Sequence, residues 1–131
     1  MAEQPRSVLV VDDVVDAVDS LALLLTLYGF EVRTAPDGPS ALASLTAGPP
    51  DVVLTDIKMP EMNGWEFVRR LRAQPGGTGI FVVVVTGFGQ EKDIVKSAEA
   101  GADLHLLKPV SPDRLVTVLE GLRPVPPLSE A

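Results

Sequence analysis

Short runs of apolar, mostly β-branched residues alternate along the chain with segments in which apolar residues recur every three or four positions. Runs that are apolar at consecutive positions are typical of strands buried on both faces, whereas the wider spacing predicts helices with one buried side. Strands are predicted at 7–11, 30–35, 51–55, 80–85 and 104–107. Helices are predicted at 16–28, from Asp37-Gly38 to Gly48-Pro49-Pro50, and at 64–73, 91–100 and 111–122.

A helix follows every strand, and this order predicts a parallel sheet with helices on both faces. The expected fold class is therefore α/β, a doubly wound (βα)₅ sheet of five strands. One apolar stripe of the first helix is expected to face the sheet, formed by Leu21, Leu24, Leu25 and Tyr28. The side that would then face solvent carries Val15, Ala22 and Leu23.

The composition narrows the class of protein. The chain has 131 residues, the size of one domain. We expect this domain at 6–122. An N-terminal tail, 1–5, would precede it, and a Pro-rich C-terminal tail or linker stub, 123–131, would follow it. Having no cysteine and one histidine, it lacks disulfides, thiol catalysis and zinc–thiolate or multi-histidine sites. A net charge of −7 disfavours nucleic acid and anionic membranes as partners. With no signal peptide and no apolar span of about 20 residues, a cytoplasmic location is expected.

Polar side chains stand where four of the predicted strands end. Asp12 and Asp13 follow the first strand and Asp56 the third, while Thr86 follows the fourth and Lys108 the fifth. In a doubly wound sheet, ligands bind beyond the carboxyl ends of the strands, so all five side chains are expected on one rim.

Each of these residues has an ordinary explanation when taken alone. An acid at a strand end often caps the next helix, threonine is common in strands, and lysine is usually at the surface. Their coincidence on one rim favours a site. Three carboxylates that repel one another need a cation, and oxygen ligands without histidine or cysteine select Mg²⁺. Lys108 and Thr86 would bind an anion beside the metal, an arrangement suited to phosphoryl transfer onto a carboxylate.

Four motifs occur in order: VLVVDD at 8–13, DVVLTDIKMPEMNG at 51–64, VVVVTGFG at 82–89 and GADLHLLKPV at 101–110. With them the chain resembles, over about residues 6–122, the receiver domain of two-component response regulators. The resemblance implies the flavodoxin-like, CheY-like strand order 2-1-3-4-5. It also implies a phospho-acceptor switch that catalyses only its own phosphorylation and dephosphorylation.

The same resemblance implies partners. A histidine kinase or a histidine phosphotransfer protein would supply the phosphoryl group. An output partner, which the sequence does not name, would read the face made by the fourth helix, the fifth strand and the fifth helix. The domain would act as a monomer or a weak dimer.

The resemblance gives each acid on the rim a role. Asp56 is expected to accept the phosphoryl group. Mg²⁺ is expected to be held by Asp12, Asp13, Asp56 and the backbone carbonyl of Lys58, with Asp12 acting through metal-bound water.

Other matched residues concern the phosphate and the turn after the acceptor. Lys108 is expected to pair with the phosphate, and Thr86 is the switch hydroxyl that moves toward it. Pro60 and Gly64 match the turn, and the Lys108–Pro109 bond is expected to be cis.

Some residues depart from the family pattern. His105 stands where the family usually has Tyr or Phe, whose ring turns inward when the threonine moves. Either His105 stays on the output face, or it still switches but only as the neutral ring. In the second case, coupling between Asp56 and the output face weakens as the pH falls from about 7.5 to about 6. Phe88 and Lys58 flank the site and are expected to affect the lifetime of the phosphorylated state.

Three other functions compete with this interpretation. A Mg²⁺-dependent phosphohydrolase of the haloacid-dehalogenase type places D-x-D on the first strand, but here the acids are adjacent and Lys58 follows Asp56 at two residues. A flavodoxin needs a Ser/Thr/Gly phosphate loop after the first strand, where this chain has Asp-Asp-Val-Val. A pseudo-receiver, an interaction module that never takes phosphate, is disfavoured by the complete set of acids, threonine and lysine.

Apolar residues beside the predicted site suggest where a phosphoryl donor docks. Val14 and Val15 border the acidic pocket, and Val15 and Leu23 are expected to face solvent. Single exposed apolar residues are common and need no explanation, but a cluster of them beside the site is more typical of a binding surface. Val15 and Leu23 are therefore predicted to form part of the docking patch for the kinase or phosphotransfer protein.

Overall fold

The computed structural model describes residues 7–121, in which five strands alternate with five helices. The strands are β1 (Ser7–Val11), β2 (Glu31–Ala35), β3 (Val52–Thr55), β4 (Phe81–Thr86) and β5 (Leu104–Leu107). The helices are α1 (Val15–Leu27), α2 (Gly38–Leu45), α3 (Gly64–Ala73), α4 (Glu91–Ala100) and α5 (Pro112–Glu120), with a 3-10 turn, η1 (Gly77–Gly79), before β4. Every predicted element is present. The two predicted tails, 1–5 and 123–131, lie outside the described residues.

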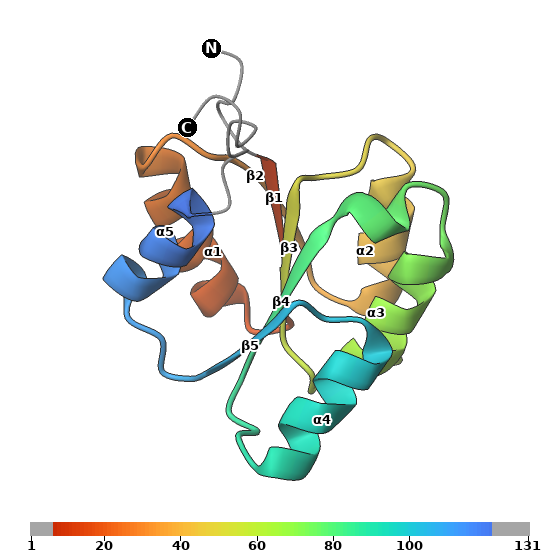
Figure 1. Cartoon of the computed structure of the whole chain (residues 1–131). Coiled ribbons are helices and arrows are strands. Elements are labelled where there is room, and N and C mark those ends of the chain that lie inside the picture. Colours follow the sequence, from red (N-terminus) through yellow and green to blue (C-terminus); the bar gives the residue numbers. More distant parts are fainter. Residues whose placement is uncertain (1–6, 122–131) are drawn as a thin grey trace, which may run out of the picture.

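The strands pair in the order β2-β1-β3-β4-β5, and every pair is parallel. Helices α1 and α5 cover one face of this sheet, and α2, α3 and α4 cover the other (Figure 1). The doubly wound fold and the expected strand order are thus confirmed. Strands β1 and β3 pair with each other, so their carboxyl ends lie side by side. The strand order reverses between them, and such folds bind ligands at this point. Within residues 7–121, none of the helices has the length and apolar character needed to cross a membrane.

The core is divided by the sheet into two halves. Along β1, Val8 and Val10 point to the α1 and α5 side, while Leu9 and Val11 point to the side of α2, α3 and α4. All four are buried, since neighbouring residues of a strand face opposite sides and both sides are covered by helices. This double burial is why the strands are apolar at consecutive positions.

Helix α1 differs from its prediction at one end. Leu25 is buried and Leu21 packs against the core as predicted, but Val18 completes the buried stripe and Tyr28 is 48% exposed. The helix ends at Leu27 and the chain then turns, so that Phe30 instead of Tyr28 joins the core cluster of Leu25. The other side of the helix is exposed at Val15 and Leu23 as predicted, whereas Ala22 is only half-exposed.

Arg72, at the end of α3, joins three segments that are distant in sequence. Its Nη1 donates to the carbonyl oxygens of Gly77 and Ile80, at 2.7 and 2.6 Å. Its Nε and Nη2 both donate to the carbonyl of Gly101, at 2.9 and 2.7 Å, and Nη2 also reaches the Asp103 carboxylate at 2.9 Å. The planar guanidinium, with its fixed set of donors, therefore ties η1, the start of β4 and the α4–β5 connection to α3.

We expect Arg72→Ala to lower the free energy of unfolding by about 2–4 kcal/mol, because it leaves several partly buried carbonyl oxygens without donors. Urea unfolding followed by circular dichroism measures this loss. The control is Arg70→Ala, which removes an ion pair with Glu66 whose arginine is 59% exposed and which should cost less than about 1 kcal/mol. Equal unfolding midpoints for the two variants would contradict the structural role given to Arg72.

Candidate functional site

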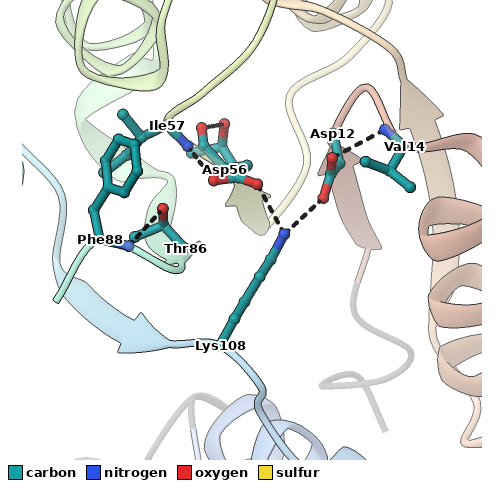
Figure 2. Close-up of polar contacts among 8 residues, drawn as sticks. Asp12, Val14, Asp56, Ile57, Thr86, Phe88 and Lys108 are labelled. Carbon is teal, nitrogen blue, oxygen red and sulfur yellow. Dashed lines mark hydrogen bonds and ion pairs between the residues drawn. The ribbon is translucent and has the colours of Figure 1, made fainter.

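Three charged side chains from three strand ends meet at the carboxyl edge of the sheet (Figure 2). Asp12 follows β1, Asp56 follows β3 and Lys108 follows β5. The Lys108 ammonium lies 2.8 Å from Oδ2 of Asp56 and 3.2 Å from Oδ2 of Asp12, so it bridges the two carboxylates. Both carboxylates are largely buried, with side chains 13% and 12% exposed. The three side chains also line a cavity of about 330 Å³ between the sheet, α1 and α5.

The second oxygen of each carboxylate is held by the backbone. Oδ1 of Asp56 accepts a hydrogen bond from the N–H of Ile57 at 2.6 Å. Oδ1 of Asp12 accepts from the N–H of Val14 at 3.1 Å, just before α1. Asp12 does not cap α1, because Val14 is the N-cap residue and the helix has no side-chain cap, and the other Asp12 oxygen is turned toward Lys108.

Lys108 carries its charge at neutral pH. Burial lowers the pKa of its ammonium, but the hydrogen bonds and charges of Asp56 and Asp12 raise it by more, so the pKa lies above its usual value. The folded state thus holds this proton more tightly than the unfolded state does. The resulting stabilisation is complete at neutral pH and is lost only as the pH rises through the folded-state pKa, above about 10.4. A fixed cation beside Asp56 suits a site that receives an anion.

Thr86 is the last residue of β4 and is only 1% exposed. Its hydroxyl oxygen accepts a hydrogen bond from the N–H of Phe88 at 3.2 Å, while the Phe88 residue itself is 41% exposed. In the view of Figure 2, Thr86 and Asp12 lie on opposite sides of Asp56. The hydroxyl therefore holds the start of the β4–α4 loop through the Phe88 backbone.

Asp13 and Lys58 are exposed, and neither joins the ion-paired cluster. Among the described residues 7–121, no three or more His, Cys, Asp or Glu side chains lie close enough together to hold a metal ion. The oxygen donors of Asp12 and Asp56 nevertheless suit Mg²⁺, which needs one or two carboxylates and keeps several waters. The donor set fits Mg²⁺ in its chemistry, with Lys108 occupying the space between the two carboxylates.

The loop after Asp56 folds closely against the backbone of this residue. The N–H of Gly64 donates to the carbonyl of Ile57 at 2.7 Å, and a Cβ at Gly64 would lie 2.1 Å from the backbone oxygen of Asp56. Only glycine allows this approach. Within the same loop, the carbonyl of Pro60 accepts from the N–H of Met62 at 2.7 Å. On the opposite side of the site, the Lys108–Pro109 bond is cis, as the resemblance implied.

His105 lies on β5 with its ring partly buried, and it is not simply exposed to solvent. Its Nδ1 lies 2.8 Å from Oγ of Ser97, and its Nε2 lies 2.7 Å from the carbonyl oxygen of Phe88. Whether the ring moves on phosphorylation stays a prediction. The sequence interpretation missed Ser97 and its neighbour Trp65. A hydroxyl on the buried side of α4 was the available signal, but its position on the helix does not identify its partners.

Comparison with known proteins identifies the family. The family model described as "Response regulator receiver domain" matches residues 8–120. The chain is 43% identical over 118 residues to the transcriptional regulatory protein PrrA of Mycobacterium bovis, a match that covers 90% of this chain and 49% of that protein. It is 40% identical over 110 residues to the sensory transduction protein RegX3 of Mycolicibacterium smegmatis, covering 84% of this chain and 47% of that protein. The chain thus spans about half the length of these relatives.

Solved structures lead to the same family. The chemotaxis response regulator CheY4 of Vibrio cholerae superposes with a TM-score of 0.85 at 31% identity, and the match covers 90% of this chain and 98% of that one. The strand order, the edge where Asp12, Asp56 and Lys108 meet, and the family match over residues 8–120 are mutually consistent. The chain therefore belongs to the receiver domains of two-component response regulators.

Proposed function

We propose that this receiver domain is a phospho-acceptor switch in which Asp56 takes the phosphoryl group. The observation that carries the proposal is the Lys108 ammonium, held between Asp56 and Asp12 at the open edge of the sheet. In phosphoryl transfer, most of the catalytic work is placing cations around the oxygens of the transferring group. Lys108 would supply one such cation beside Asp56, where the oxygens of the transferring group would arrive.

The second cation in this proposal is Mg²⁺. Asp12, Asp13, Asp56 and the backbone carbonyl of Lys58 would hold it, and when bound it would neutralise charge on the phosphoryl oxygens. The carboxylates of Asp12 and Asp56 are already anchored by backbone N–H groups, which reduces the reorganisation needed for binding. Asp13 is exposed and free to turn toward the pair.

The phosphoryl group would come from a histidine kinase or a histidine phosphotransfer protein. The domain would catalyse its own phosphorylation and dephosphorylation and would turn over no other substrate. Val15 and Leu23, which are 65% and 62% exposed on α1, would form part of the surface on which the donor docks. A donor that covers these side chains would remove apolar surface from water, which would stabilise the complex.

The signal would leave through α4, β5 and α5. Thr86 would move toward the phosphoryl group and give up its hydrogen bond from Phe88, which loosens the β4–α4 loop. Apolar residues next to this loop are exposed at Ile94, Val95 and Leu107. A partner that binds one arrangement of the loop more tightly would shift the population toward it.

We expect Asp56→Asn to abolish the gain of one phosphoryl mass on incubation with acetyl phosphate and Mg²⁺, because an amide oxygen does not act as the nucleophile. Intact-protein mass spectrometry measures this. The matched control is Asp51→Asn, since Asp51 precedes β3 at the opposite end of the same strand. Wild-type protein that gains no mass would favour the pseudo-receiver, and labelling retained by Asp56→Asn would move the acceptor elsewhere.

We expect Lys108→Met to have opposite effects on metal binding and on phosphorylation. Removing a cation from between two carboxylates should strengthen Mg²⁺ binding by about threefold to tenfold, whereas phosphorylation by acetyl phosphate should slow at saturating Mg²⁺. Asp13→Asn should instead weaken Mg²⁺ binding. Calorimetric titration gives the affinities, with Lys92→Met on the exposed surface of α4 as the control. Unchanged affinity in both Lys108→Met and Asp13→Asn would place the metal elsewhere.

We expect Val15→Glu to slow phosphoryl transfer from a protein donor by about tenfold while leaving labelling by acetyl phosphate unchanged, because the new charge resists burial at the interface. The measurement compares both donors in parallel, using a kinase or phosphotransfer protein that phosphorylates the wild-type chain. Ile94→Glu is the control, a similarly exposed apolar residue on α4. Equal slowing with both donors would remove the docking role.

A further inference from the structure

A chain of hydrogen bonds outside the phosphorylation site joins α3, α4 and β5 to the loop after Thr86. The indole Nε1 of Trp65 donates to Oγ of Ser97 at 3.0 Å. The same Oγ lies 2.8 Å from Nδ1 of His105, and Nε2 of that ring lies 2.7 Å from the carbonyl oxygen of Phe88. We call Trp65, Ser97, His105 and the Phe88 carbonyl the histidine network.

The chemistry of the two ends sets the direction of the outer bonds in the histidine network, and a neutral ring then sets that of the bond between Ser97 and His105. An indole N–H only donates and a carbonyl oxygen only accepts, so Nε2 of His105 carries a proton toward Phe88. In the neutral ring Nδ1 is then an acceptor, and the Ser97 hydroxyl donates to it while accepting from Trp65. With this neutral ring, every donor and acceptor in the network has a partner.

The burial of Ser97 makes these bonds costly to break. Ser97 is 1% exposed, on the side of α4 that packs against the fold. A buried hydroxyl costs free energy unless it is hydrogen-bonded, and its loss would also leave the indole N–H and Nδ1 without partners. On the outer side, the Lys96 ammonium lies 4.9 Å from the centre of the Trp65 ring, a cation–π contact that further restrains the indole.

The network ends on a residue already tied to the phosphorylation site. The N–H of Phe88 donates to the Thr86 hydroxyl at 3.2 Å, and its carbonyl accepts from His105 at 2.7 Å. Both backbone polar groups of Phe88 are therefore held, one by the strand that carries the switch threonine and one by β5. If Thr86 moves, the bond from His105 would still hold the Phe88 carbonyl.

We propose that Ser97 and Trp65 are positioning residues for the β4–α4 loop: they orient the His105 ring so that its Nε2–H holds the Phe88 carbonyl. The effect on the phosphorylated state rests on the proposed function, but the positioning itself does not. His105 stands where the family usually has Tyr or Phe. In this chain its two ring nitrogens take part in a hydrogen-bonded restraint on the loop.

The test is a double-mutant cycle on Ser97→Ala and His105→Phe, read by hydrogen exchange without Mg²⁺ or phosphate. Each single variant should speed amide exchange at Phe88, whose N–H is bonded to Thr86, by about tenfold, and Ser97→Ala should also expose the Trp65 indole N–H to exchange. The double variant should exchange no faster than either single one, because both changes break the same chain of bonds. Ser20→Ala, an exposed serine on α1, is the control.

Additive effects of the two changes, or an unchanged loop in Ser97→Ala, would overturn the proposal. Amide exchange in β1 and the urea midpoint separate a loosened loop from a destabilised fold. A second readout, the rate of phosphate loss after labelling with acetyl phosphate, should change at least threefold in Ser97→Ala while labelling at Asp56 persists. If the wild type takes no label, the proposed function fails, and the exchange experiment still decides the role of Ser97 and Trp65.

Discussion

The repulsion between two buried carboxylates, and the single ammonium that offsets it, is the constraint on which this site depends. The strand order places β1 beside β3, so Asp12 and Asp56 are brought together by the fold whether or not their charges favour it. Lys108 arrives from β5, two strands beyond β3, and its ammonium contacts both carboxylates.

The core on both faces of the sheet holds the repelling carboxylates in place. Strands buried on both faces are rigid supports, and three of them carry the charged residues at their ends. The loops then add close contacts that allow little movement: Gly64 lies against the backbone of Asp56, and backbone N–H groups hold one oxygen of each carboxylate. Precise placement of reacting groups depends on such support from packing and hydrogen bonds.

Much of the fold could be predicted because buried parallel strands leave a strong pattern in a single sequence. The errors occurred where that pattern competes with chain geometry. Tyr28 matched the helical stripe, yet the chain turns at the end of α1 and Phe30 fills the core instead. The order of residues at a strand end also could not tell which of two adjacent acids pairs with Lys108: in the structure it is Asp12, while Asp13 is exposed.

The sequence by itself determined the class of fold and the edge of the sheet where the charged strand-end residues stand, because strand periodicity and strand-end positions are local properties. Only the tertiary structure decided which oxygens face Lys108 and which face the backbone. It alone joined Trp65 to Ser97, and Ser97 to His105. These contacts span 32 and 8 residues of sequence. Such pairings follow from how helices pack on the sheet, and no local pattern encodes the direction of a side chain across that distance.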